Sequence, residues 1–127
     1  MIRHVFRIAL SVVTLVFGGC GKSPDAAAGI AKTPEQAASQ VEQAFAGADS
    51  KMKELANATS EALRKNEYEN AVTSLRALHG SESLSPEQRV ATYSSSVTLE
   101  ARLISAMQAG DKNAERAYQL LKALKRD

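Results

Sequence analysis

Two nearly identical tetrapeptides mark two positions at which helices of this chain are expected to begin. They are Thr33-Pro-Glu-Gln36 and Ser85-Pro-Glu-Gln88. In each string the hydroxyl can cap the amide three residues later, proline suits the first helical position, and glutamine can reach back to the cap. The glutamate lies in the first turn, where negative charge suits the helix dipole. Both strings therefore predict helix starts, and a chain organised around them is expected to be all-α.

The spacing of apolar residues predicts the helices themselves. Residues 38–62 carry a stripe whose steps alternate between three and four, the pattern of a narrow packing seam. Its members are Ala38, Val41, Phe45, Ala48, Met52, Leu55, Thr59 and Ala62. Gly47 interrupts the stripe and Asp49 could cap a new helix, so residues 34–66 form either one helix or two.

Further helices are expected over residues 67–78, over residues 86–109 and after Asp111. The helix over residues 86–109 is apolar across a wide arc, so it should be the most buried element. No segment has the alternation of a convincing strand. The predicted fold is a small helical bundle, or a set of antiparallel helical hairpins, with four or five helices.

The start of the chain has a different character. Arg3 and Arg7 precede an apolar run over residues 8–17, which is shorter than the ~20 residues that span a bilayer. Two small residues then precede Cys20, the only cysteine. This order resembles the signal peptide and lipobox of bacterial lipoproteins. The resemblance implies cleavage after Gly19 and a diacylglycerol on the Cys20 thiol.

That resemblance divides the chain into three parts and implies a location. Residues 1–19 would be a cleaved signal peptide, residues 20–32 the lipidated cysteine with a flexible tether, and residues 33–127 an α-helical domain. The domain would face the periplasm from a membrane of the cell envelope. The string Cys20-Gly21-Lys22-Ser23 resembles the start of inner-membrane-retained adaptor lipoproteins of drug-efflux pumps. That sorting code differs between lineages, so this string does not decide between the two membranes. We expect the outer membrane, with the inner membrane as the alternative.

Charge argues against a nucleic-acid partner. The formal net charge is +2, and Arg3 and Arg7 account for all of it. After cleavage the acidic and basic side chains would balance. Nucleic-acid binding needs clustered, uncompensated Lys and Arg, so we expect no nucleic acid among the partners.

Two segments of the domain are alike. Residues 71–78 and 117–124 share the pattern A-[VY]-x-x-L-[RK]-A-L, and a break in a longer helical stretch precedes each. Over residues 52–124 this resembles a degenerate pair of tetratricopeptide-type helical hairpins. In that family a small residue before an acidic one turns the first helix into the second, and an alanine lets the two pack closely. The matching residues are Leu63, Asn66, Glu67, Tyr68 and Ala71 in one unit, and Gly110, Asp111 and Ala117 in the other. A plain bundle would give the same repeated string and stays open.

No group of polar residues predicts catalysis. After cleavage His79 would be the only histidine, without the three or four ligands that a metal site needs. No Gly-x-Ser-x-Gly elbow surrounds a serine, and no glycine-rich phosphate loop is present. We therefore expect no enzyme activity, no metal, no cofactor and no small-molecule substrate.

The sequence leaves two hypotheses for function. In the first, the protein is a noncatalytic membrane-anchored lipoprotein whose helical domain binds an envelope protein or itself. Phe45, Met52 and Tyr68 are the candidate interaction residues, if they are exposed members of the stripes rather than core. In the second, the stripe over residues 38–62 forms a coiled coil, and the protein is an oligomeric structural spacer of the envelope.

Overall fold

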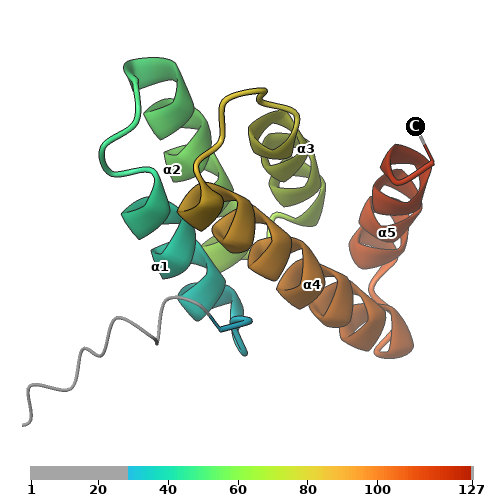
Figure 1. The fold of residues 1–127 in the computed structure, drawn as a ribbon. Helices are drawn as coiled ribbons and strands as arrows, with labels where there is room; N and C mark the ends of the chain where they lie inside the picture. The colour runs from blue at the N-terminus through green and yellow to red at the C-terminus, as the bar shows by residue number, and fades with distance from the viewer. Residues whose placement is uncertain (1–28, 127) are drawn as a thin grey trace, which may run out of the picture.

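A computed structural model describes residues 29–126, and all regular elements in this part of the chain are α-helices. The predicted signal peptide, with its cleavage site at Gly19, and the predicted lipidation site at Cys20 lie outside the described residues. The helices are α1 (Pro34–Ala44), α2 (Ser50–Lys65), α3 (Tyr68–His79), α4 (Pro86–Gln108) and α5 (Lys112–Leu124). The predicted fold class, a small all-α bundle of antiparallel hairpins, is confirmed (Figure 1).

Both predicted tetrapeptides begin helices. Ser85 forms the complete capping box, because its side chain accepts from the Gln88 amide while the Gln88 side chain accepts from the Ser85 amide. Thr33 caps the Gln36 amide at 3.2 Å, but the Gln36 side chain accepts from the Lys32 amide instead. Both arrangements satisfy amides that the first helical turn leaves without partners.

The segment over residues 34–66 forms two helices, not one. Phe45 ends α1, and Asp49 caps α2 by accepting from the Met52 amide at 3.0 Å. The apolar stripe is thus folded back on itself as the α1–α2 hairpin. Its two halves pack against each other, so the uninterrupted helix that a coiled coil over residues 38–62 requires is not formed.

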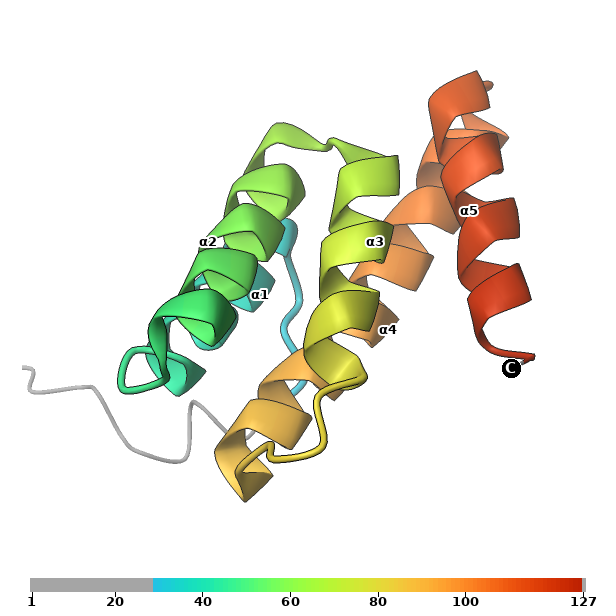
Figure 2. The same cartoon turned by 90° about the horizontal axis from the view of Figure 1, so that it is seen from above.

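The helices make two layers. Figures 1 and 2 show α1 beside α4 in one layer and α2 beside α3 in the other, with α5 at one end against α3 and α4. The main core lies between these layers. Its larger buried side chains are Leu63, Tyr68, Val72, Leu75, Leu99, Leu103 and Leu121. A smaller cluster of Val41, Phe45, Ala56 and Leu78 closes the side next to the α1–α2 turn.

The two hairpins that look alike in sequence also turn alike. Each first helix ends on a residue with positive φ, Asn66 at 54° and Gly110 at 88°. In each turn the next amide bonds the carbonyl five residues back at 3.0 Å: Glu67 to Ala62, and Asp111 to Ala106. This is the pattern of a Schellman cap, which reverses the chain after a helix. The alanines that follow, Ala71 and Ala117, are buried.

The expectation that residues 86–109 form the most buried helix is wrong. Leu99 and Leu103 are buried, but Val90, Tyr93 and Ile104 are among the most exposed large apolar residues of the described chain. The reason is that α4 contacts α1, α3 and α5, and the side chains that point away from these helices stay exposed. Much of the buried side carries serine and threonine.

Candidate interaction surface

The side of α4 that faces away from the core is apolar. Its side chains recur every three or four residues, which places them along one stripe of the helix. We call this stripe the α4 outer face; it consists of Val90, Tyr93, Val97, Ala101 and Ile104. Tyr93 is 61% exposed, Val90 42% and Ile104 40%. Contiguous exposed apolar side chains on a soluble domain mark contact sites more often than scattered ones do.

The chain enters the domain beside this face. Residues 29–32 lie against α4 before α1 begins, with Ala31 buried and Ile30 49% exposed. The sequence predicted a flexible tether as far as Lys32. The end of that segment, residues 29–32, is instead part of the packed domain. Hydrogen bonds with Gln40, Ser94 and Thr98 hold this segment in place. The sequence of the segment itself does not predict these bonds.

Three polar side chains hold the entering main chain. The Ala31 amide donates to Ser94 Oγ at 2.8 Å, and Thr98 Oγ1 donates to the Ala31 carbonyl at 2.6 Å. Gln40 of α1 donates to the Gly29 carbonyl at 2.8 Å and accepts from Ser94 Oγ at 2.8 Å. We call Gln40, Ser94 and Thr98 the clamp. Because a buried main chain must satisfy its polar groups, the clamp explains why α4 has buried hydroxyls at Ser94 and Thr98.

Two shallow grooves adjoin the segment that the clamp holds. One is lined by Gly29, Ile30, Arg89, Val90, Tyr93 and Ser94. The other is lined by Ala31, Lys32, Thr33, Pro34, Val97, Thr98, Ala101, Arg102 and Ser105. In both, aliphatic side chains form much of the floor, and Arg89, Lys32 and Arg102 bring positive charge. The surface around the point of chain entry is thus apolar with basic side chains beside it.

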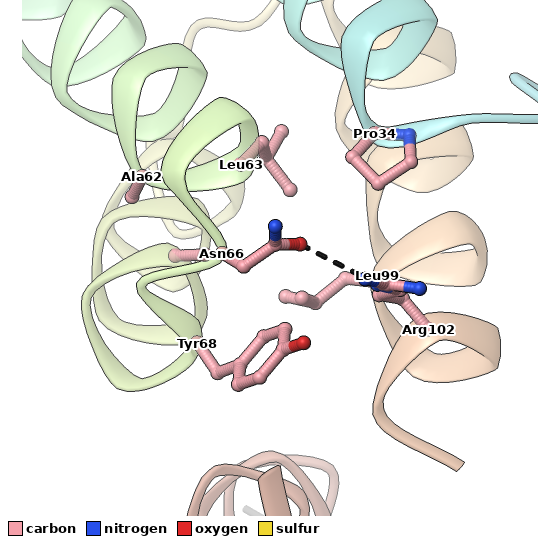
Figure 3. A pocket seen from close by; sticks show the side chains of 8 residues that line it. Pro34, Ala62, Leu63, Asn66, Tyr68, Leu99 and Arg102 are labelled. Carbon is pink, nitrogen blue, oxygen red and sulfur yellow. Dashed lines mark hydrogen bonds between the residues drawn. The ribbon is translucent and has the colours of Figure 1, made fainter. Parts of the chain in front are cut away.

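A third hollow, drawn in Figure 3, is too small for a substrate. It lies where α2, α3 and α4 meet, and Asn66, Tyr68 and Leu99 are among its lining residues. Arg102 Nε donates to Asn66 Oδ1 across its mouth at 3.4 Å, drawn as the dashed line. Its volume of about 10 Å³ is roughly the room that one water molecule needs. We interpret it as a packing gap.

The structure places the predicted interaction residues as follows. Phe45 and Tyr68 are core residues, 1% and 8% exposed, so neither offers a surface to a partner. Phe45 packs with Val41 and Leu78, where α1 turns into α2. Met52 is half-buried beside the same cluster. The three are not brought together as one patch, and the exposed apolar side chains lie on α4 instead.

At the surface, ion pairs join α1 to α2, α3 to α5, and α4 to the end of α5. Arg64 of α2 donates to Glu42 of α1, with Nη2 to Oε2 at 2.8 Å, and this hydrogen bond lowers the pKa of the Glu42 carboxyl. Lys125 donates to Glu100 at 2.6 Å and links the end of α5 to α4. His79 is exposed at the last position of α3. Within residues 29–126 no three His, Cys, Asp or Glu side chains gather as metal ligands.

Over the same residues, none of the helices has both the length and the hydropathy needed to cross a membrane. Comparison with protein-family models, with curated proteins and with solved structures finds no match for this chain. The functional assignment therefore depends on the surface of α4 and on the N-terminal sequence.

Proposed function

We propose that this protein is a noncatalytic lipoprotein, anchored through Cys20, whose helical domain acts in the cell envelope by protein–protein interaction. The observation that carries this proposal is the α4 outer face. It is a large exposed apolar stripe of the described domain, and it lies next to the segment that leads to the anchor. Exposed apolar patches mark protein or membrane contact sites, so this face indicates a domain that works by contact while it is held beside the anchor.

The use of the polar side chains supports a role in contact rather than in chemistry. Thr33, Asp49, Ser85 and Asp111 cap helices. The clamp holds main chain, and the pairs Glu42–Arg64, Glu69–Arg116 and Glu100–Lys125 join neighbouring helices. A catalytic site would instead bring acids, bases or nucleophiles together at a cavity.

The N-terminal sequence supports the anchor. Cys20 is the only cysteine, and it stands after a basic start, a short apolar run and two glycines. A diacylglycerol, with or without a third chain, would hold the domain at the membrane much more firmly than a single acyl chain could. The membrane would then be one partner and an envelope protein the other.

Two measurements on the tagged full-length protein test this proposal. Mass spectrometry of protein purified from membranes is expected to find an N-terminal Cys20 with the added mass of a lipid. A photoreactive amino acid placed in each layer, at Tyr93 on α4 or at Ala58 on α2, is expected to capture one discrete envelope protein from at least one position. Both sites are exposed.

The matched control is Cys20→Ala in each photoreactive variant. Loss or weakening of the captured protein in this control supports a tethered interaction module. Capture of only a second copy of the chain would overturn the proposed hetero-partner and favour self-association. An unmodified Cys20 in membrane-derived protein would overturn the lipid anchor.

A further inference from the structure

We propose that the α4 outer face and Ile30 rest on the lipid surface of the membrane that holds the anchor. This inference rests on the proposed anchor at Cys20 and goes beyond it, because it assigns an orientation and a lipid-contacting face to the domain. Partner proteins would then meet the α2–α3 layer or the sides of the bundle.

The segment that leads toward Cys20 meets the domain beside the α4 outer face. The clamp fixes Ala31 through both its amide and its carbonyl, and Gln40 fixes the Gly29 carbonyl. Ile30 is therefore held beside Val90 and Tyr93, with which it lines one groove. A lipid on Cys20 would pull on the domain at this point, and not at the α2–α3 layer.

The stretch of chain between the proposed anchor and the clamp is short. Cys20 lies about nine residues before Gly29, so this stretch spans at most ~30 Å even when fully extended. That reach is no longer than α4 itself, whose 23 residues make a rod of ~35 Å. A domain of this size on so short a connection stays close to the bilayer, and the surface at the point of attachment meets the bilayer first.

The residue types of the α4 outer face also suit a lipid surface. Tyrosine with aliphatic neighbours is the composition that membrane interfaces favour, because the ring is apolar and its hydroxyl stays with the headgroups. Lys32, Arg89 and Arg102 line the same grooves. Long basic side chains can lay their stems on apolar surface and extend their charges to lipid phosphates. Glu100 on α4 is paired with Lys125, which reduces the repulsion it would give an anionic surface.

The chain contains no tryptophan, so a single introduced indole reports its own surroundings. The experiment compares Tyr93→Trp with Ala58→Trp, an exposed position on α2. Each full-length variant is purified from membranes in its processed form, and the mass of Cys20 with its lipid is verified. The proteins are then reconstituted into vesicles of phosphatidylethanolamine and phosphatidylglycerol that contain brominated lipid, which quenches indole fluorescence on contact. Circular dichroism checks that both variants keep their helices.

We expect the indole at position 93 to emit at shorter wavelength and to be quenched by brominated lipid at least about twofold more than the indole at position 58, because only the former lies in the interface. Replacing Lys32 and Arg89 together by Gln in the Tyr93→Trp protein should reduce that quenching, and vesicles without phosphatidylglycerol should reduce it similarly.

Three results would overturn the inference. One is equal lipid quenching at the two positions in protein whose Cys20 is acylated, which leaves the anchor intact but removes the preferred face. Another is an indole at position 93 that is shielded from aqueous iodide yet not quenched by lipid, which would mean that a second copy covers the face. The third is capture of a protein, instead of lipid, from position 93 in cells. Failure of the anchor itself is seen separately, as an unmodified Cys20.

Discussion

Helices α3 and α4 cross the same core, but they distribute their apolar residues in opposite ways. In α3 the buried side contains Tyr68, Val72 and Leu75, while Thr73 and Arg76 are exposed. This is the usual amphipathic pattern. In α4 the buried side includes Thr92, Ser94, Ser95 and Thr98 as well as Leu99 and Leu103, and the exposed side carries Val90, Tyr93 and Ile104.

The difference shows that α4 meets two demands that α3 does not. On its inner side it must supply hydrogen-bond partners to an extended segment of main chain, and hydroxyl side chains do this where leucine could not. On its outer side it has no helix of the described domain to cover it. Apolar residues there are costly for a solitary domain but suited to one that rests on another surface.

The largest difference in the free energy of unfolding is expected between alanine substitutions at two neighbouring residues, one on each side of α4. Leu103→Ala removes a side chain with no exposure and should lower the free energy of unfolding by about 2–5 kcal/mol. Ile104→Ala, one position along and 40% exposed, should lower it by less than about 1 kcal/mol. Urea denaturation measures both, and equal losses would contradict the assigned inner and outer sides.

The next effect is expected from the clamp. Ser94→Ala leaves the Ala31 amide buried without its 2.8 Å partner and should cost about 1–3 kcal/mol. Ser96→Ala is the matched control, because its half-buried hydroxyl only bonds the Thr92 carbonyl within the same helix. Amide hydrogen exchange offers a direct readout, since Ala31 should lose protection in Ser94→Ala and keep it in Ser96→Ala. Unchanged protection in both variants would show that the clamp is not formed.

Replacing Ser95 is expected to change the free energy of unfolding by less, and in the opposite direction. Its Oγ is the one buried side-chain oxygen or nitrogen within residues 29–126 that has no hydrogen-bond partner. Ser95→Ala should therefore be neutral or raise the free energy of unfolding by up to about 1 kcal/mol, because a desolvated hydroxyl is removed. Thermal denaturation beside Ser94→Ala tests the contrast between two adjacent serines. A loss of stability as large as that of Ser94→Ala would mean that the hydroxyl has a role the fold does not explain.

The smallest effect is expected away from both helices, at the Glu42–Arg64 pair of α1 and α2. The hydrogen bond from Arg64 lowers the pKa of Glu42 in the folded state, so its stabilisation is present above the unfolded pKa and is lost as pH falls through the folded pKa. Since both side chains are 40% exposed, we expect less than about 1 kcal/mol. Glu42→Gln should remove this part of the pH dependence below about pH 4.5. Denaturation from pH 7 to pH 3 checks it, and an identical pH profile in the variant would refute a contribution from the pair.

The sequence predicted the helices well because their signals are local. The caps at Thr33, Ser85 and Asp111 and the turns at Asn66 and Gly110 act within a few residues of the helix ends, and local chemistry is readable without a structure. The sequence did not decide whether a helix ends after Phe45, because the apolar stripe continues past this position. The Asp49 cap explains why the helix restarts there.

The candidate site could not be predicted in the same way. The side of α4 that is buried depends on residues 29–32, which lie more than sixty positions away from Ser94 and Thr98 in the chain. In α4 an apolar arc includes both Leu103 and Ile104, so periodicity alone could not separate core from surface. Phe45 and Tyr68 could be core or interface for the same reason, and tertiary packing placed both in the core. The one available signal was the group of hydroxyl residues at positions 92, 94–96 and 98, in the middle of the predicted helix.

The central claim is that an anchor at Cys20 holds the α4 outer face against another surface, and thiol accessibility tests it most directly. Cys20 is the only cysteine, so the lipidated parent should not react with an impermeant maleimide in cells with a permeabilised outer membrane. Tyr93→Cys should then label several-fold more slowly than Ala58→Cys, and adding Cys20→Ala should remove the difference. Equal labelling of positions 93 and 58 in the anchored protein would contradict the account.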